Sequence, residues 1–171
     1  MDKSEIIPSK SKDELFMRQV YLNADFSKDP RTKIGAVLTL EDKIVSTGFN
    51  GFPRKVVDYK FRYENRETKY NFICHAESNS VTTAARFGRA TLGTTFYTQG
   101  IPCQDCCKTV IQAGIARIIV HKQWPDLIYS EKWVKGIEIS KIMMDEAGVG
   151  LSYLDCVLGV QGTLDGKIIN V

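Results

Sequence analysis

The sequence predicts an α/β fold, a three-layer α/β/α sandwich in which helices cover both faces of a central mixed five-stranded sheet. Short apolar runs of strand length alternate with segments of helical periodicity along the chain. The first two apolar runs are joined by a short turn, which is typical of an antiparallel hairpin. The later runs are separated by single helices, and such crossover connections join parallel strands. Helices are then needed on both faces of the sheet to bury its apolar side chains.

Length and composition indicate one folded domain. The chain has 171 residues, of which 43% are hydrophobic and 25% are charged, close to the average for globular proteins. We expect a single domain over residues 1–171, with a core at about 11–154 and a C-terminal extension at about 155–171. The sequence has no apolar run of about 18 residues and no apolar leader at its N-terminus. These features predict no membrane partner and a cytoplasmic location.

Charge and cysteine content narrow the function. The chain has 23 basic and 20 acidic residues, and a net charge of +3 is too small to predict a nucleic-acid partner. An odd number of cysteines in a chain without an export signal argues against a disulfide framework. A metal or catalytic role therefore has to be considered for Cys74, Cys103, Cys106, Cys107 and Cys156.

The N-terminal part is expected to form one helix followed by a hairpin. Ser11 and Glu14 have the spacing of a capping box, which predicts a helix from about residue 12 to 26. Apolar runs at 34–40 and 44–49 flank a short charged turn, which predicts two antiparallel strands.

The middle and the C-terminal part differ in regularity. Residues 50–72 are charged and aromatic without clear periodicity, so we expect a long loop that contacts a substrate or a partner. The Asp165-Gly166 pair predicts the turn of a small terminal hairpin. Between them, the pattern predicts helices at about 75–87, 104–113 and 131–147 and strands at 94–98, 117–121 and 151–154.

The strongest chemical signal is a set of metal-ligand side chains at two predicted helix starts. His75 precedes one helix, and Cys103 and Cys106 lie at the start of another, after Pro102. One imidazole and two thiolates can hold a tetrahedral zinc whose fourth position stays open, as in a catalytic site. The partial positive charge of a helix N-terminus also favours the thiolate form of both cysteines.

Glu77 supplies the general base that such a site needs. Zinc with two thiolates and a neutral histidine is formally uncharged, so a bound water requires a base beside it. Glu77 follows His75 by two positions and can lie next to the metal without ligating it. Two simpler interpretations stay open: a closed structural zinc site, and an acidic side chain that only favours the helix dipole.

These motifs resemble those of a known family. The segments around His75, Glu77, Cys103 and Cys106 match the H-x-E…P-C-x-x-C signature of zinc-dependent nucleobase deaminases. Together with residues 27–37, 48–53 and 69–74, they resemble the zinc-dependent cytidine and deoxycytidylate deaminases over about residues 15–154.

The resemblance implies a cytidine-deaminase-like fold and hydrolysis of dCMP to dUMP, which supplies dUMP for thymidylate synthesis. Zinc-bound hydroxide would attack C4 of cytosine, with Glu77 carrying the proton to N3 and to the departing ammonia. Relatives are hexamers, so the resemblance also implies a homo-oligomer. We expect one zinc per chain, because residues 50–73 contain neither cysteine nor histidine.

The resemblance also implies positions for the substrate. Asn50 corresponds to the residue that contacts the sugar, and Arg31 to a phosphate contact, with Lys33 as a weaker candidate. Arg31 and Lys33 are otherwise solvated charges, and Asn50 is otherwise part of a turn. Ala76 and Thr98 are expected to line the base pocket.

Several positions carry more than one interpretation. Trp124 and Tyr129 either stack on cytosine or pack at a subunit contact. Asn50 and Gly51 belong to a turn that binds dCTP as an activator in regulated relatives, where dTTP inhibits. Lys55 replaces the usual last glycine of that turn and puts this regulation in doubt.

The remaining cysteines and the second histidine have simpler interpretations. Cys107 stands one helical turn from Cys103 and competes with Cys106 as a ligand, although we interpret it, with Cys74 and Cys156, as a small buried side chain. His121 ends an apolar strand, where a structural role is expected.

Other functions remain as alternatives. A deaminase of the same scaffold could act on dCTP or on dCMP with a methyl or hydroxymethyl group at position 5. A deaminase of RNA bases and a non-catalytic zinc module fit the low net charge less well.

Overall fold

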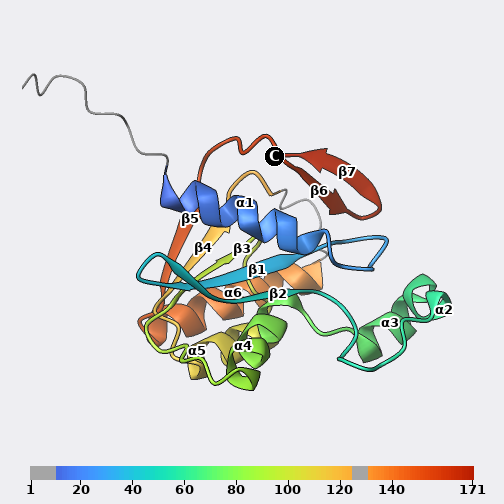
Figure 1. Ribbon diagram of the computed structural model, residues 1–171, viewed down its shortest axis with the longest axis horizontal. Helices are drawn as coiled ribbons and strands as arrows, with labels where there is room; N and C mark the ends of the chain where they lie inside the picture. Colours follow the sequence, from blue (N-terminus) through green and yellow to red (C-terminus); the bar gives the residue numbers. More distant parts are fainter. Residues whose placement is uncertain (1–10, 125–130) are drawn as a thin grey trace, which may run out of the picture.

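The computed structural model describes residues 11–124 and 131–171, in which five strands form one mixed sheet in the order β2-β1-β3-β4-β5 (Figure 1). β1 is antiparallel to both β2 and β3, and β4 is parallel to both β3 and β5. The expected mixed five-stranded sheet is confirmed. The strands are β1 Gly35–Leu40, β2 Lys43–Phe49, β3 Thr95–Thr98, β4 Arg117–His121 and β5 Gly150–Leu154.

Helices cover the sheet on both sides, as the expected sandwich requires. α1 lies over one face, whereas α4, α5 and α6 lie together over the other (Figure 1). In the part of the chain that the structure describes, no helix is long and apolar enough to cross a membrane. The four helices are α1 Lys12–Ala24, α4 Ala76–Arg86, α5 Gln104–Gln112 and α6 Glu131–Glu146.

Each face of the sheet has its own core, because neighbouring strand residues point to opposite sides. Val37 of β1 and Tyr97 of β3 pack toward α1, in one apolar cluster. The adjacent Leu38 and Phe96 pack toward α4 and α5, in the other cluster. β1 is buried over nearly its whole length because it is central and covered on both faces.

Two glycines allow helices to lie unusually close to the sheet. A Cβ atom at Gly35 would collide with the backbone carbonyl of Val20 in α1. A Cβ atom at Gly48 of β2 would collide with the carbonyl of Ala76 and the backbone of Ser80 in α4. The second contact fixes the start of α4 against the end of β2.

The expectation of an irregular loop over residues 50–72 is wrong. Two short helices occur there, α2 at Lys60–Glu64 and α3 at Arg66–Phe72. Asn65 separates them and caps α3, because its side chain accepts a hydrogen bond from the Thr68 backbone N–H. Each helix is too short to give the repeated apolar pattern on which the sequence interpretation depended.

Aromatic contacts hold this pair of helices in place. The rings of Phe52 and Tyr63 stack with centroids 4.3 Å apart, and Phe72 lies 5.7 Å from Phe52. The Arg62 guanidinium lies over the Phe72 ring at 4.4 Å. The aromatic residues that made the segment look irregular therefore form its packing.

The start of α1 is correctly predicted, but the capping box is wrong. Ser11 occupies the N-cap position, yet its side chain makes no capping hydrogen bond. Asp13 and Glu14 lie in the first turn, where negative charge favours the helix dipole. α1 ends at Ala24, slightly before the expected end.

The C-terminal extension forms a second, two-stranded sheet of β6 Gln161–Leu164 and β7 Lys167–Asn170. Asp165 and Gly166 form the turn, as expected, both with positive φ. The hairpin packs on the α1 side of the molecule, where Leu164 and Trp124 belong to the same apolar cluster as Tyr21. The extension therefore completes one of the two cores.

Candidate active site

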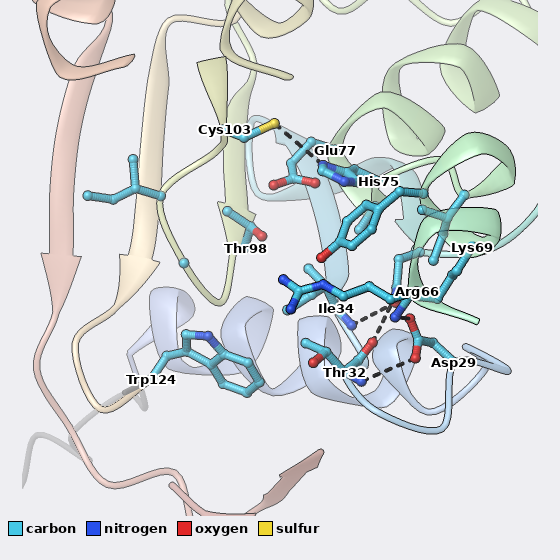
Figure 2. Close-up of a pocket in the computed structure, with 16 residues that line it drawn as sticks. Asp29, Thr32, Ile34, Arg66, Lys69, His75, Glu77, Thr98, Cys103 and Trp124 are labelled. Atoms are coloured by element: carbon cyan, nitrogen blue, oxygen red, sulfur yellow. Dashed lines mark hydrogen bonds and ion pairs between the residues drawn. The ribbon is translucent and has the colours of Figure 1, made fainter. Parts of the chain in front are cut away.

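A cavity of about 180 Å³ opens where β1 begins and β3 ends. Its walls come from the segment before β1, the end of β2, helix α3, the start of α4 and the loop after β3 (Figure 2). The lining residues are Asp29, Thr32, Ile34, Asn50, Arg66, Lys69, Tyr70, Ile73, His75, Ala76, Glu77, Thr98, Gly100, Ile101, Cys103 and Trp124.

Three side chains at the inner end of this cavity form a metal-ligand cluster. His75 is the N-cap residue of α4, Cys103 is the N-cap residue of α5, and Cys106 lies in the first turn of α5. Nδ1 of His75 lies 3.5 Å from Sγ of Cys103 and 3.4 Å from Sγ of Cys106. In the described residues this is the group of His, Cys and acidic side chains placed to hold a metal.

These distances fit zinc. Zn–S and Zn–N bonds of about 2.3 and 2.0–2.1 Å at tetrahedral angles place nitrogen and sulfur about 3.5 Å apart. Both observed N–S distances agree with that value. The donor set also matches that of catalytic zinc sites, where three protein ligands leave one position for water or substrate.

The protonation states of the three side chains in the cluster depend on one another. Hydrogen bonds from Cys106 and His75 lower the pKa of the Cys103 thiol to about 4. The same contact, together with the charge of Glu77, raises the pKa of His75 to about 9. Cys106 next to this thiolate is buried, and both causes raise the pKa of its thiol. A divalent cation would replace the protons that the cluster otherwise holds.

Glu77 lies beside the cluster without belonging to it. Its side chain is buried in the first turn of α4, and its Oε2 accepts a long contact of 3.8 Å from Cys106 Sγ. Burial raises the pKa of this carboxyl, and the nearby His75 opposes the shift. A raised pKa makes the protonated form accessible, which suits a group that accepts and releases a proton.

The wall of the cavity formed by residues 32–35 is held by hydrogen bonds from two side chains, which lie directly after strands β2 and β3. Asn50 accepts a hydrogen bond from the Ile34 N–H at 2.8 Å and donates to the Thr32 carbonyl at 2.8 Å. Gln99 accepts from the Gly35 N–H at 2.6 Å and donates to the Lys33 carbonyl at 2.9 Å. These bonds hold the backbone of residues 32–35 along the edge of the cavity.

A buried ion pair joins this wall to α3. Nζ of Lys69 lies 2.9 Å from Oδ2 of Asp29, and both side chains are less than a tenth exposed. Asp29 Oδ1 also accepts the N–H groups of Arg31 at 2.9 Å and Thr32 at 3.4 Å. Asp29 thus organises the segment before β1 and neutralises Lys69.

Comparison with known proteins identifies the family. Residues 10–122 match the sequence model of the cytidine and deoxycytidylate deaminase zinc-binding region. The chain belongs to the cytidine and deoxycytidylate deaminase family. The cluster of His75, Cys103 and Cys106 lies within the matched region and suits one zinc ion.

Individual relatives agree with this membership. An uncharacterized deaminase in the luxG 3′ region of Aliivibrio fischeri is 35% identical over 139 residues, covering 81% of this chain and 90% of that protein. Human deoxycytidylate deaminase is 38% identical over 112 residues, which cover 62% of each protein. The dCMP deaminase of cyanophage S-TIM5, solved in complex with dCMP and dUMP, shares the fold. It has a TM-score of 0.62 at 22% identity, covering 82% of this chain and 95% of that chain.

Most site residues predicted from the deaminase motifs lie at the cavity. Asn50, Ala76, Thr98 and Trp124 all line it. Thr98 is fully buried and donates a hydrogen bond of 3.2 Å to the carbonyl of Gly35. Trp124 is 4% exposed and is part of the α1-side core as well as the cavity wall.

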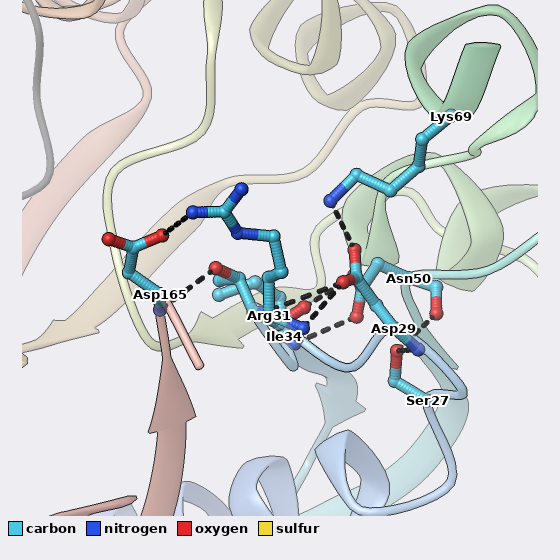
Figure 3. Close-up of polar contacts among 8 residues, drawn as sticks. Ser27, Asp29, Arg31, Ile34, Asn50, Lys69 and Asp165 are labelled. Carbon is cyan, nitrogen blue, oxygen red and sulfur yellow. Dashed lines mark hydrogen bonds and ion pairs between the residues drawn. The ribbon is translucent and has the colours of Figure 1, made fainter. Parts of the chain in front are cut away.

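The two basic residues predicted to contact phosphate lie elsewhere. The Arg31 guanidinium points to the C-terminal hairpin, where it forms an ion pair of 2.7 Å with Asp165 (Figure 3). Lys33 directs its Nζ to the carbonyl of Asp25 at 3.4 Å. Neither residue lines the cavity.

In the turn predicted to bind an effector, Asn50 lines the cavity and Gly51 does not. Gly51 pairs with Cys74 through two backbone hydrogen bonds of 2.8 and 3.1 Å. Lys55 has φ of 71°, so it adopts the left-handed conformation that glycine favours. The backbone of this turn therefore retains the shape that a glycine at this position permits.

Tyr129 lies outside the described residues.

Two residues outside the cluster are buried, which agrees with the structural roles expected for them. Cys107 is fully buried in the α4-side core, and its thiol contacts the carbonyl of Ser140 in α6 at 3.5 Å. His121 is buried between the Tyr21 hydroxyl at 2.8 Å and the Cys156 carbonyl at 2.9 Å. Cys74 and Cys156 are only half-buried, so complete burial is wrong for these two.

The sequence interpretation missed the cavity-lining side chains of α3. Arg66, Lys69 and Tyr70 lie on one face of this helix, Ile73 follows directly after it, and all four line the cavity. Their spacing of i, i+3, i+4 and i+7 is that of a helix face, with Asn65 as its cap. This spacing is the available signal, but two of the four side chains are charged, so the segment shows no apolar period.

Proposed function

We propose that the chain is a zinc-dependent deaminase that hydrolyses dCMP to dUMP and ammonia. The observation that carries the proposal is the cluster of His75, Cys103 and Cys106 with Glu77 beside it, at the inner end of a cavity. Family membership and the 38% identity to human deoxycytidylate deaminase support this choice of substrate.

Zinc bound to this cluster would lower the pKa of a water and so supply the nucleophile for C4 of cytosine. Glu77 takes one proton from the water and gives a proton to N3 of the ring. It then transfers the second proton of the water to the departing amine, which leaves as ammonia. Burial of Glu77 supports this role, because it raises the pKa of the carboxyl and so favours the protonated form that gives the proton back.

The remaining cavity residues would position the nucleotide. Asn50 has committed one N–H and one lone pair to the wall, so its amide still has one N–H and one lone pair for a sugar hydroxyl. Ala76 and Thr98 would border the base, and Trp124 offers an aromatic surface beside it.

Arg31 is paired with Asp165, so a phosphate would compete with this carboxylate for the guanidinium. The same argument applies with less force to Lys33, whose long contact to a carbonyl is weak. The effector role of Asn50 and Gly51 for dCTP and dTTP stays a prediction.

We infer the setting of the enzyme from the same observations. The chain forms a single domain. It assembles into a homo-oligomer, which the family resemblance implies is a hexamer. The enzyme supplies dUMP for thymidylate synthesis. A cytoplasmic location is supported by five cysteines that are all free thiols.

The test is ammonia release by purified protein of known zinc content. The substrates are dCMP, its 5-methyl and 5-hydroxymethyl forms, dCTP, deoxycytidine and CMP, each with and without dCTP or dTTP as effector. We expect turnover of dCMP above the others. If the enzyme prefers a 5-substituted nucleotide or dCTP, that nucleotide is the substrate in place of dCMP. Zinc binding without turnover of any substrate would contradict the proposal.

A further inference from the structure

The two cations of α3 that line the cavity differ in what they face. Lys69 is buried against Asp29, and the two opposite charges cancel. Arg66 is exposed, and the ion pairs that the structure records among residues 11–124 and 131–171 do not include it. Arg66 therefore brings an uncompensated positive charge to the cavity.

The side chain of Arg66 directs this charge into the cavity. Figure 2 shows its guanidinium reaching into the cavity, between Thr98 on one side and Thr32 on the other. Its Cζ lies 5.6 Å from the centroid of the Tyr70 ring, so the ring faces the cation and supports the side chain. Because Arg66 is exposed and Glu77 is buried, the cation stands nearer the opening and the acid at the inner end.

A nucleoside monophosphate has the matching arrangement of groups. When the base lies next to Glu77, the sugar separates it from the phosphate, which must extend toward the opening. An arginine is always protonated, and its planar fork can donate two parallel hydrogen bonds to phosphate oxygens.

We propose that Arg66 binds the 5′-phosphate of the substrate and makes the enzyme select nucleotides over nucleosides. The inference rests on the proposed function, since it requires the cytosine ring to lie beside Glu77. It assigns the phosphate contact to α3 and not to the segment before β1.

The other nearby cations fit this role less well. A phosphate bound to Lys69 would lie next to the buried carboxylate of Asp29, and two anions would share one cation. Arg31 lies outside the cavity lining and is paired with Asp165. Arg66 binds a phosphate without breaking an existing ion pair.

The test compares Arg66→Ala, Arg66→Lys and a control, Lys60→Ala, in zinc-loaded protein. Arg66→Ala should lower kcat/KM for dCMP by about 10- to 100-fold, the loss expected for a hydrogen bond to a charged group. The value for deoxycytidine should change by less than about twofold, since it has no phosphate. Arg66→Lys keeps the charge but loses the fork, so its dCMP activity should be intermediate. Lys60 is 90% exposed on neighbouring α2, and its loss should affect neither substrate.

Binding of the products measures the same contact without turnover. In calorimetric titrations, Arg66→Ala should weaken dUMP binding by a similar factor and leave deoxyuridine binding unchanged. Equal losses for nucleotide and nucleoside, or no loss for the nucleotide, would overturn the role of Arg66. If the zinc-loaded wild-type protein fails to deaminate dCMP, the proposed function is overturned, whereas the dUMP titrations still decide the role of Arg66.

Discussion

At the scale of single residues, the cluster depends on where two helices begin. His75 and Cys103 are both N-cap residues, so their side chains leave the backbone at the positive ends of α4 and α5. Cys106 follows Cys103 by one turn and completes the set. Helix starts thus bring the ligands together, and their partial positive charge favours the thiolate form of a cysteine.

Replacing Glu77 tests whether this residue transfers protons without being a zinc ligand. Glu77→Gln keeps the size of the side chain and removes the proton acceptor, so turnover of dCMP should fall by about 100- to 10,000-fold. Zinc content should stay at one per chain, because Glu77 is outside the ligand cluster. Glu146→Gln, at an exposed position of α6, is the matched control. Turnover at a substantial rate in Glu77→Gln would remove Glu77 from the chemistry.

Two adjacent cysteines provide a paired test of the ligand assignment. Cys106→Ala should lower bound zinc toward zero, since a ligand of the cluster is lost. Cys107→Ala should keep full zinc, because this thiol faces Ser140 in the core. Zinc content by atomic absorption checks both variants, and the reverse pattern would make Cys107 the ligand.

The ligand set could be read from the sequence, but the side chains of α3 could not. Histidine and cysteine are rare, and their spacing at helix starts carries a specific meaning. An exposed arginine such as Arg66 looks the same in sequence as any solvated charge. Arg31 shows the same problem in reverse, since only the fold brings Asp165 next to it.

At the scale of elements, α3 is joined to the segment before β1 by the ion pair of Lys69 and Asp29. Both partners are buried, so the charges stabilise the fold only as a pair. The pair therefore determines where α3 and its cavity-lining face lie relative to the sheet.

Breaking this pair should destabilise the protein strongly. Lys69→Met leaves the Asp29 carboxylate buried without a cation, at a cost of about 3–5 kcal/mol in the free energy of unfolding. Lys69→Met combined with Asp29→Asn removes both charges and should recover much of the loss, because an amide oxygen can still accept the backbone N–H groups. Lys28→Met breaks the exposed pair with Asp58 and should cost less than about 1 kcal/mol. Urea unfolding measures all three, and a double variant no better than the single one would contradict this account.

Strands and long helices of this chain could be predicted, whereas short polar helices could not. β4 lies at the predicted residues, since a buried strand is a continuous apolar run between turns. α2 and α3 are held by ring stacking and by the Asn65 cap, contacts that no apolar period reveals. The Ser11 capping box failed for the opposite reason, because a favourable motif does not ensure that its hydrogen bonds form.

At the scale of the whole molecule, His121 connects three distant parts of the chain. It lies at the end of β4, between Tyr21 of α1 and Cys156 after β5. Accepting from the Tyr21 hydroxyl and donating to the Cys156 carbonyl requires the neutral ring. Burial lowers the pKa of His121 below its usual value of 6.5.

Stability should therefore depend on pH through His121. The folded state resists protonation more than the unfolded chain does, so the free energy of unfolding is fully retained above about pH 7 and falls as pH drops below about 6.5. His121→Gln stays neutral and should show a shallower decline. Urea unfolding of the wild type and of His121→Gln between about pH 5.5 and 8 checks this prediction. Protonation of the zinc ligands affects both proteins equally, so the difference between their pH dependences reports on His121. Equal slopes would show that His121 does not titrate in this range.

The sheet order and the place of the C-terminal extension arise only in the complete molecule. The alternation of strands and helices predicted a mixed sheet with two helical layers, but not that the terminal hairpin would pack on α1. That contact depends on Gly162, where a side chain would collide with Trp124 and crowd Tyr21. A close approach between segments so far apart in sequence leaves no local pattern.

The backbone of residues 32–35 is already held before a nucleotide arrives, because Asn50 and Gln99 bond to four of its polar groups. Ordering a free backbone residue costs about 1–2 kcal/mol of conformational entropy, and here folding has met that cost in advance. Binding then has to restrict side chains of the cavity lining, of which Arg66 and Tyr70 of α3 are exposed. The backbone on one side of the cavity is therefore fixed before binding, whereas exposed side chains such as Arg66 and Tyr70 are not. The conformational entropy lost on association then comes from side-chain rotamers and not from the backbone.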